Sequence, residues 1–127
     1  MKFKAVVIDD EFFNRSLISL LISRLSENFV IVGEAENIKD GKALIEETKP
    51  DVVFLDIKMP DGNGFELIAQ FENRAFEVVF VSGFDEFHVK ALNSESFDYI
   101  LKPIDLEIFN MILKKICLKI GKKGLRG

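Results

Sequence analysis

Residues 52–56 read Val-Val-Phe-Leu-Asp, a short apolar run that ends in a carboxylate. Three other apolar runs of similar length lie at residues 5–8, 29–32 and 78–81, and a weaker one lies at residues 99–101. Apolar and polar residues do not alternate within these runs. Strands without alternation are buried on both faces, which is typical of a parallel sheet covered by helices.

The gaps between the runs carry helical patterns. The first predicted helix has an apolar stripe at i, i+4, i+7 and i+8, formed by Phe13, Leu17, Leu20 and Leu21. The last has a comparable stripe, formed by Leu106, Phe109, Leu113, Ile116 and Ile120. Asp105 is its expected N-cap and Gly121 the residue expected to end it. Helices are also predicted at residues 38–47, 64–71 and 85–92.

A strand followed by a helix, five times over, predicts an α/β fold with right-handed crossovers. We expect a flavodoxin-like (βα)5 fold, a doubly wound five-stranded parallel sheet with strand order 2-1-3-4-5. No internal linker or repeat interrupts the pattern, so residues 1–121 are predicted to form one domain. Residues 122–127 are predicted to be a basic tail or the start of a linker.

Composition excludes several classes of function. The 127-residue chain has one cysteine, Cys117, and one histidine, His88, which excludes an intrachain disulfide and zinc sites built from several Cys or His side chains. The net charge of −4 argues against direct nucleic-acid binding by this domain. No apolar run has the length of a membrane span, and the first residues do not form a signal peptide. A cytoplasmic protein without a membrane partner is therefore expected.

Polar side chains stand where the predicted strands end. Asp9-Asp10-Glu11 follows the first strand, Asp56 the third, Ser82 the fourth and Lys102 the fifth. Each alone has a structural explanation, since Asp and Ser are common helix caps. Together they lie on the carboxyl edge of one parallel sheet, where ligands bind in such folds. The sequence therefore predicts a single pocket with three carboxylates, a hydroxyl and an amine.

Three carboxylates in one pocket repel each other unless a cation accompanies them. Oxygen ligands without His or Cys suit Mg²⁺. A carboxylate nucleophile, a metal, a lysine and a hydroxyl are together suited to phosphoryl transfer, because the cations and the hydroxyl offset charge on the phosphoryl oxygens.

Four motifs in this order and spacing resemble the CheY-like receiver domain of two-component response regulators: Ile8-Asp9-Asp10-Glu11, residues 55–64 (LDIKMPDGNG), Val81-Ser82-Gly83 and Leu101-Lys102-Pro103. The resemblance covers about residues 3–120. The stretches around residues 84–87 and 98–103 are most similar to receivers of LytTR-type regulators.

The resemblance implies a role for each acidic residue. Asp56 would accept a phosphoryl group from the phosphohistidine of a histidine kinase, forming an aspartyl phosphate. Asp10 and Asp56 would bind Mg²⁺ directly, Asp9 would bind it through water, and the backbone carbonyl of Lys58 would complete the protein ligands. The domain would be a phosphoacceptor rather than an enzyme.

The resemblance also implies a switch. Ser82 would move its hydroxyl towards the phosphoryl group, and Tyr99 would turn inward with it. Lys102 would contact the phosphoryl oxygens, and its bond to Pro103 is expected to be cis. Ser82 stands where threonine is commoner in the family. Phe84, two residues later, is expected to shield the acyl phosphate from water.

In this family the face formed by helix 4, strand 5 and helix 5 carries the output. We expect that face to control transcription through a DNA-binding domain outside this chain, and it is a candidate surface for a homodimer. Two alternatives stay open. One is an interaction module with the receiver fold that works without phosphorylation. The other is an Asp-nucleophile phosphohydrolase, which would need a second aspartate where Lys58 stands.

Overall fold

The computed structural model describes residues 2–83 and 97–126, and of residues 123–126 the backbone alone. The predicted helix at residues 85–92 and the expected role of Phe84 lie outside the described residues. So does His88.

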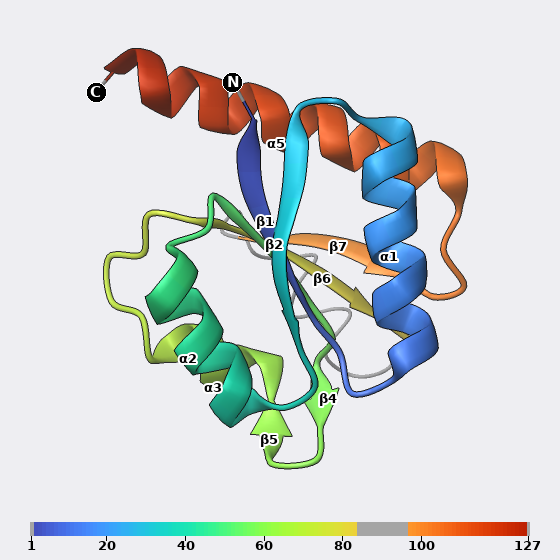
Figure 1. The fold of residues 1–127 in the computed structure, drawn as a ribbon, viewed down its shortest axis with the longest axis vertical. Helices are drawn as coiled ribbons and strands as arrows, with labels where there is room; N and C mark the ends of the chain where they lie inside the picture. The colour runs from blue at the N-terminus through green and yellow to red at the C-terminus, as the bar shows by residue number, and fades with distance from the viewer. Residues whose placement is uncertain (1, 84–96, 127) are drawn as a thin grey trace.

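One five-stranded sheet forms the centre of the molecule (Figure 1). Its strands are β1 (Phe3–Ile8), β2 (Phe29–Ala35), β3 (Val52–Leu55), β6 (Glu77–Ser82) and β7 (Asp98–Leu101). All are parallel, and their order is β2-β1-β3-β6-β7. Because β6 and β7 are the fourth and fifth strands of this sheet along the chain, the predicted order 2-1-3-4-5 is confirmed.

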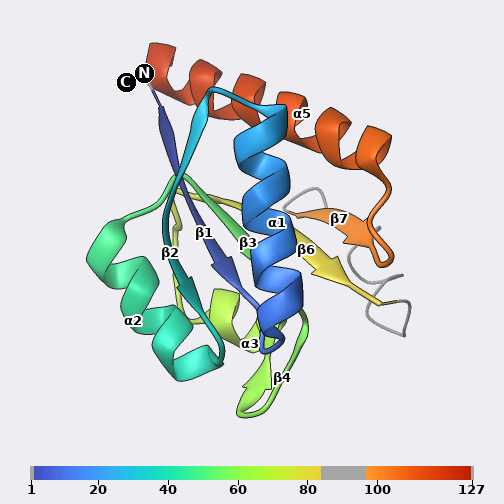
Figure 2. The ribbon, with the colours of Figure 1, turned by 45° about the vertical axis from the view of Figure 1, so that its right-hand side comes forward.

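Helices cover both faces of the sheet (Figure 2). On one face α1 (Phe12–Leu25) and α5 (Leu106–Arg126) pack through residues such as Ile22 and Phe109. On the other face α2 (Ile38–Thr48) and α3 (Gly64–Ala69) pack through residues such as Ile45 and Leu67. The sheet therefore separates two apolar cores, as doubly wound folds do. None of the helices in the described residues is long and apolar enough to cross a membrane.

The sequence did not predict the small hairpin between β3 and α3. Its strands are β4 (Lys58–Met59) and β5 (Gly62–Asn63), which pair antiparallel. Gly62 has φ of 151°, a region that favours glycine. Asn63 then caps α3 by accepting from Glu66 N–H, while the Glu66 side chain accepts from Asn63 N–H. This capping box fixes the start of α3 directly behind the hairpin.

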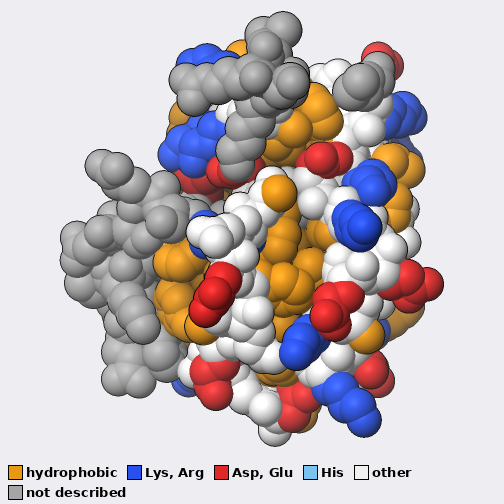
Figure 3. Space-filling model, turned by 90° about the vertical axis from the view of Figure 1, so that its left-hand side faces the viewer, with side chains coloured by type: hydrophobic (Ala, Val, Ile, Leu, Met, Phe, Trp, Pro, Cys, Tyr) orange, Lys and Arg blue, Asp and Glu red, His pale blue; other side chains and the backbone are white. Residues whose placement is uncertain are grey.

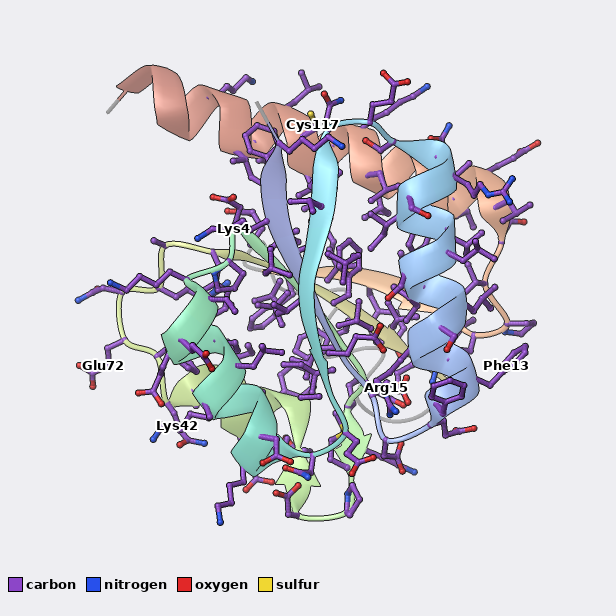
Figure 4. All side chains as sticks on the ribbon, viewed as in Figure 1. Lys4, Phe13, Arg15, Lys42, Glu72 and Cys117 are labelled. Atoms are coloured by element: carbon purple, nitrogen blue, oxygen red, sulfur yellow. The ribbon has the colours of Figure 1, made fainter. Side chains whose placement is uncertain are left out.

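The predicted apolar stripe of α1 is wrong in part. Phe13 is 73% exposed and Leu20 is 51% exposed, whereas Ile18 and Ile22 are buried against the sheet. Figure 4 shows Phe13 pointing away from the molecule. Because α1 has apolar residues around much of its circumference, the helical period alone does not identify the buried face.

Two expectations for α5 are also wrong. Leu106 is 57% exposed at its first turn, although Phe109, Leu113, Ile116 and Ile120 are buried as predicted. Gly121 does not end the helix, which continues to Arg126. A terminating glycine adopts a positive φ, and among the described glycines that holds for Gly62 alone. The N-cap is as predicted, because Asp105 Oδ1 accepts from the N–H groups of Glu107 and Ile108.

Burial on both faces holds for the central strands but not for β2. The residues of β3 are all buried, whereas Val30 and Val32 of β2 are 40% and 36% exposed. β2 lies at the edge of the sheet, so its continuous apolar run is only partly covered.

A hollow lined by hydrophobic side chains lies between α2 and the loop that leads to β6 (Figure 3). Ile45, Phe71 and Phe76 contribute to its lining. The hollow also includes Pro50 and Asp51, which directly precede β3. It therefore lies towards the amino edge of the sheet, away from the predicted pocket.

Candidate functional site

Segments far apart in the sequence meet at the carboxyl edge of the sheet, at the end of the molecule opposite the two termini (Figure 1). Asp9 and Asp10 follow β1, and Asp56 follows β3. One carboxylate oxygen of each lies within 4.8 Å of the others. Asp9 and Asp56 are buried, and Asp10 is exposed. The acidic cluster predicted from the strand ends is therefore present.

Hydrogen bonds surround the Asp56 carboxylate. Its Oδ1 accepts from the backbone N–H of Ile57 and from the Ser82 hydroxyl, both at 2.6 Å. Its Oδ2 accepts from Lys102 Nζ at 3.0 Å. A donor from β6 and a donor that follows β7 thus converge on the carboxylate that ends β3. A group attached to Asp56 would lie within reach of both.

Lys102 also contacts Asp9, with Nζ 3.1 Å from Asp9 Oδ2. The ammonium therefore bridges the two buried carboxylates. The Lys102–Pro103 peptide bond is cis, as expected. The backbone N–H of Lys102 donates to the carbonyl of Ser82, which ties the end of β7 to the end of β6.

The electrostatics of the pocket reflect burial and crowding. Burial raises the pKa of Asp9, and the charge of Asp56 adds to this, although the backbone N–H of Glu11 and the Lys102 ammonium act in the opposite direction. Burial alone would lower the pKa of Lys102, but its hydrogen bond and charge contact with Asp56, helped by Asp9, raise it. In the folded protein the ionised form of Asp9 is therefore disfavoured, and the protonated form of Lys102 is favoured.

The donor set fits a hard divalent cation. Three carboxylates approach one point, and among the described residues no Cys or His belongs to the cluster. Mg²⁺ prefers such oxygen ligands. Its positive charge would also favour the ionised form of Asp9, which burial and, to a smaller degree, the charge of Asp56 disfavour.

The remaining predicted residues lie around this centre. The Tyr99 hydroxyl donates to the carbonyl of Gly83 at 3.0 Å, one residue beyond Ser82. The Tyr99 ring is partly buried against the core on the α2 and α3 face of the sheet. Lys58 is exposed at the start of β4, two residues after Asp56. Its backbone carbonyl stays a predicted metal ligand.

Gly64 allows α3 to pack close behind Asp56. A Cβ atom at this position would lie 2.7 Å from the backbone oxygen of Asp56 and 3.0 Å from Cε1 of Phe80. Contacts this short between a Cβ and a backbone oxygen are not found in folded proteins, so a side chain here would displace the loop that carries Asp56.

Arg15 is the site-related residue that the sequence did not reveal. Its Nη1 donates to the backbone carbonyl of Asp9 at 2.6 Å, and its Nε lies 3.4 Å from Glu34 Oε1. The only sequence signal was a basic residue one turn into the helix that follows the acidic motif. Nothing in that pattern specifies a backbone carbonyl as the partner.

Known proteins share both this sequence pattern and this fold. The family model for the response regulator receiver domain matches residues 5–114. The Transcriptional regulatory protein BtsR of Escherichia coli is 38% identical over 104 residues, which are 80% of this chain and 43% of that protein. The Sensory transduction protein LytT of Bacillus anthracis is 38% identical over 104 residues, 80% of this chain and 42% of that protein. The chain thus spans less than half the length of these relatives.

A solved structure agrees with the sequence matches. The response regulatory domain of protein mrkE from Klebsiella pneumoniae superposes with a TM-score of 0.82 at 32% sequence identity. The alignment covers 94% of this chain and 98% of that domain. The predicted likeness to receivers of regulators such as LytT is confirmed by the relatives. The chain belongs to the response regulator receiver domain family.

Proposed function

We propose that the chain is a phosphoacceptor switched by a histidine kinase, with Asp56 as the accepting residue. The observation that carries this proposal is the surroundings of Asp56: Ser82 Oγ at 2.6 Å, Lys102 Nζ at 3.0 Å, and two further carboxylates close by. Donors grouped around this carboxylate are placed to stabilise the phosphoryl oxygens when Asp56 attacks phosphorus.

In the proposed transfer a carboxylate oxygen of Asp56 forms a bond to phosphorus. The bond between phosphorus and the kinase imidazole nitrogen breaks, and its electron pair stays on the imidazole. Lys102 then contacts a phosphoryl oxygen, and the Ser82 hydroxyl donates to another. Asp9, Asp10, Asp56 and the Lys58 carbonyl would hold Mg²⁺. The ion would offset the negative charge of the phosphoryl oxygens.

Phosphoramidate, a small phosphodonor with a P–N bond, tests this proposal without the kinase. With Mg²⁺ we expect the intact mass to rise by one phosphoryl group, and we expect hydroxylamine to remove it, as it does for an acyl phosphate. Asp56→Asn should stay unmodified, and chelation of Mg²⁺ should slow the wild-type reaction. Unchanged modification of Asp56→Asn would refute the assignment. No modification of the wild type would favour the phosphorylation-independent interaction module.

The phosphohydrolase alternative is less well supported. That chemistry needs an acidic side chain two residues after the nucleophile, and Lys58 occupies this position. A lysine there does not act as the general acid that such an enzyme requires at this point.

We further propose that phosphorylation alters the face that includes β7 and α5, and that this face controls transcription through a second domain. The hydroxyl of Tyr99 on β7 bonds to the loop after Ser82, which gives the pocket a direct contact with this strand. On α5, Ile108 and Met111 are exposed and lie one turn apart, which suits a homodimer contact. Sedimentation with and without beryllofluoride and Mg²⁺ tests the dimer, and unchanged mass at all concentrations would refute it.

A further inference from the structure

We propose that Arg15 is a positioning residue that holds the loop of Asp9, Asp10 and Glu11 in the shape that binds Mg²⁺. This inference rests on the proposed function, because it concerns the same metal site. Arg15 itself contributes no ligand atom. It acts through the backbone of the residue that precedes Asp10.

Arg15 joins the ends of two strands to α1. Its Nη1 donates to the carbonyl of Asp9, directly after β1, at 2.6 Å. Its Nε lies 3.4 Å from Oε1 of Glu34, which is on β2. The other carboxylate oxygen of Glu34 accepts from the Ser19 hydroxyl at 3.2 Å. Figure 4 shows Arg15 between the first turns of α1 and the strands.

The contact is largely withdrawn from solvent. The side chain of Arg15 is only 12% exposed, against 37% for that of Glu34. Its guanidinium also lies over the ring of Phe12, 5.7 Å from the ring centroid. A planar guanidinium with several fixed donors is ordered by such surroundings, whereas a lysine ammonium is not. Glu34 and Phe12 therefore hold the Arg15 guanidinium independently of its bond to the loop.

The other bonds of Asp9 among the described residues do not reach its backbone carbonyl. Its N–H donates to the carbonyl of Ala35, and its side chain accepts from the Glu11 N–H and from Lys102 Nζ. Glu11 is the N-cap of α1 but makes no side-chain capping bond. The bond from Arg15 to the Asp9 carbonyl thus fixes the peptide that leads into Asp10. The path of these flanking peptides determines where Asp10 lies relative to Asp9 and Asp56, each of which has a carboxylate oxygen within 4.8 Å of one of its own.

An electrostatic role and a positioning role of Arg15 predict opposite changes in Mg²⁺ affinity when the residue is removed. Removing a positive charge near a cation site strengthens cation binding if charge alone matters. Releasing a ligand-bearing loop weakens it, because the loop must then be ordered when the metal binds. The sign of the change in affinity therefore separates a positioning role from a merely electrostatic one.

The test is the Mg²⁺ dissociation constant, measured by titration calorimetry for wild type, Arg15→Ala and Arg15→Lys. We expect about tenfold weaker binding for Arg15→Ala, as for other residues that orient metal ligands. Arg15→Lys should lie between the two, since lysine keeps the charge but lacks the fork that reaches both Asp9 and Glu34. Arg24→Ala, an exposed arginine on the same helix, is the matched control and should bind like wild type.

Unchanged or tighter Mg²⁺ binding by Arg15→Ala would overturn the inference, even if its melting temperature in EDTA falls. If Arg15→Ala does not fold, Arg15→Lys decides: weaker binding supports the positioning role, and wild-type affinity refutes it. Failure of the proposed function gives a different result, namely a wild-type protein that binds Mg²⁺ but is not modified by phosphoramidate. A wild-type protein that does not bind Mg²⁺ would overturn this inference.

Discussion

At the scale of single residues, Gly64 shows how closely the site is packed from behind. A methyl group there would lie 2.7 Å from the Asp56 backbone oxygen and 3.1 Å from Cγ of Leu55. We expect Gly64→Ala to lower the free energy of unfolding by about 2 kcal/mol, because the backbone oxygen moves only if the Asp56 loop moves. Urea denaturation measures this change, and weaker Mg²⁺ binding should accompany it.

Gly121→Ala is the matched control for this substitution. Nothing lies within 4 Å of a Cβ at Gly121, which is inside α5. Alanine there should raise the free energy of unfolding by about 0.5 to 1 kcal/mol, through the better helix propensity of alanine alone. Equal effects at the two positions would show that the close approach of Gly64 to Asp56 does not constrain the fold.

At the scale of elements, the sequence predicted the strands of the sheet, but it predicted only in part which side of each helix is buried. A run such as residues 52–55 is apolar without alternation, and few structures other than a central parallel strand bury such a segment. Predicting the face of α1 failed because its apolar residues occupy more than one side. The side of α1 that packs on the sheet depends on how the helix docks. The docking depends in turn on residues far from α1 in the sequence.

The contact between the hairpin and α2 gives a prediction about pH. Asp61, in the turn between β4 and β5, accepts from the N–H groups of Ile38 at 2.8 Å and Lys39 at 3.0 Å. The bond from Ile38, helped by that from Lys39, outweighs partial desolvation and lowers the pKa of Asp61 from its ordinary 3.8. A lowered pKa in the folded state means that the ionised carboxylate stabilises the fold.

The stabilisation should be complete above pH 3.8 and should disappear as pH falls through the lower pKa of the folded state. We therefore expect Asp61→Asn to be less stable than wild type at neutral pH, with a difference that shrinks in acid. Urea midpoints between pH 7 and pH 3 measure this. Glu72→Gln removes an exposed carboxylate from the segment that follows α3 and is the control for loss of one charge (Figure 4). A pH-independent difference would contradict the prediction.

At the scale of the whole molecule, the site is where separate parts of the chain meet. Lys102 bonds to Asp9 and to Asp56, which are 93 and 46 residues away in sequence. The sequence alone predicted that these residues lie close together, because the carboxyl ends of parallel strands share one edge of the sheet. It did not identify Arg15, since a bond to the Asp9 carbonyl depends on the exact path of the loop. The sequence can therefore predict which side chains gather at the ends of the strands. It cannot predict which side chains bond to the backbone carbonyls that hold those strand ends in place.

The bridging position of Lys102 predicts how Mg²⁺ and stability are linked. Lys102→Met leaves Asp9 and Asp56 buried and facing each other without their ammonium. In EDTA we expect the free energy of unfolding to fall by about 2 kcal/mol, less than for a fully buried pair because Lys102 is partly exposed. Mg²⁺ should then stabilise the variant more than wild type, since the ion no longer competes with Lys102 for the same oxygens.

Urea denaturation with EDTA and with saturating Mg²⁺ measures the free energy of unfolding of wild type and of Lys102→Met in both conditions. Lys114→Met, at an exposed lysine of α5, is the control and should change stability by no more than about 0.5 kcal/mol in either condition. An equal gain from Mg²⁺ in wild type and Lys102→Met would contradict the prediction, because it would mean that the ammonium and the metal use different oxygens. A larger stabilisation of the variant by Mg²⁺ would mean that, in the absence of the ion, Lys102 binds the same carboxylate oxygens as the ion does.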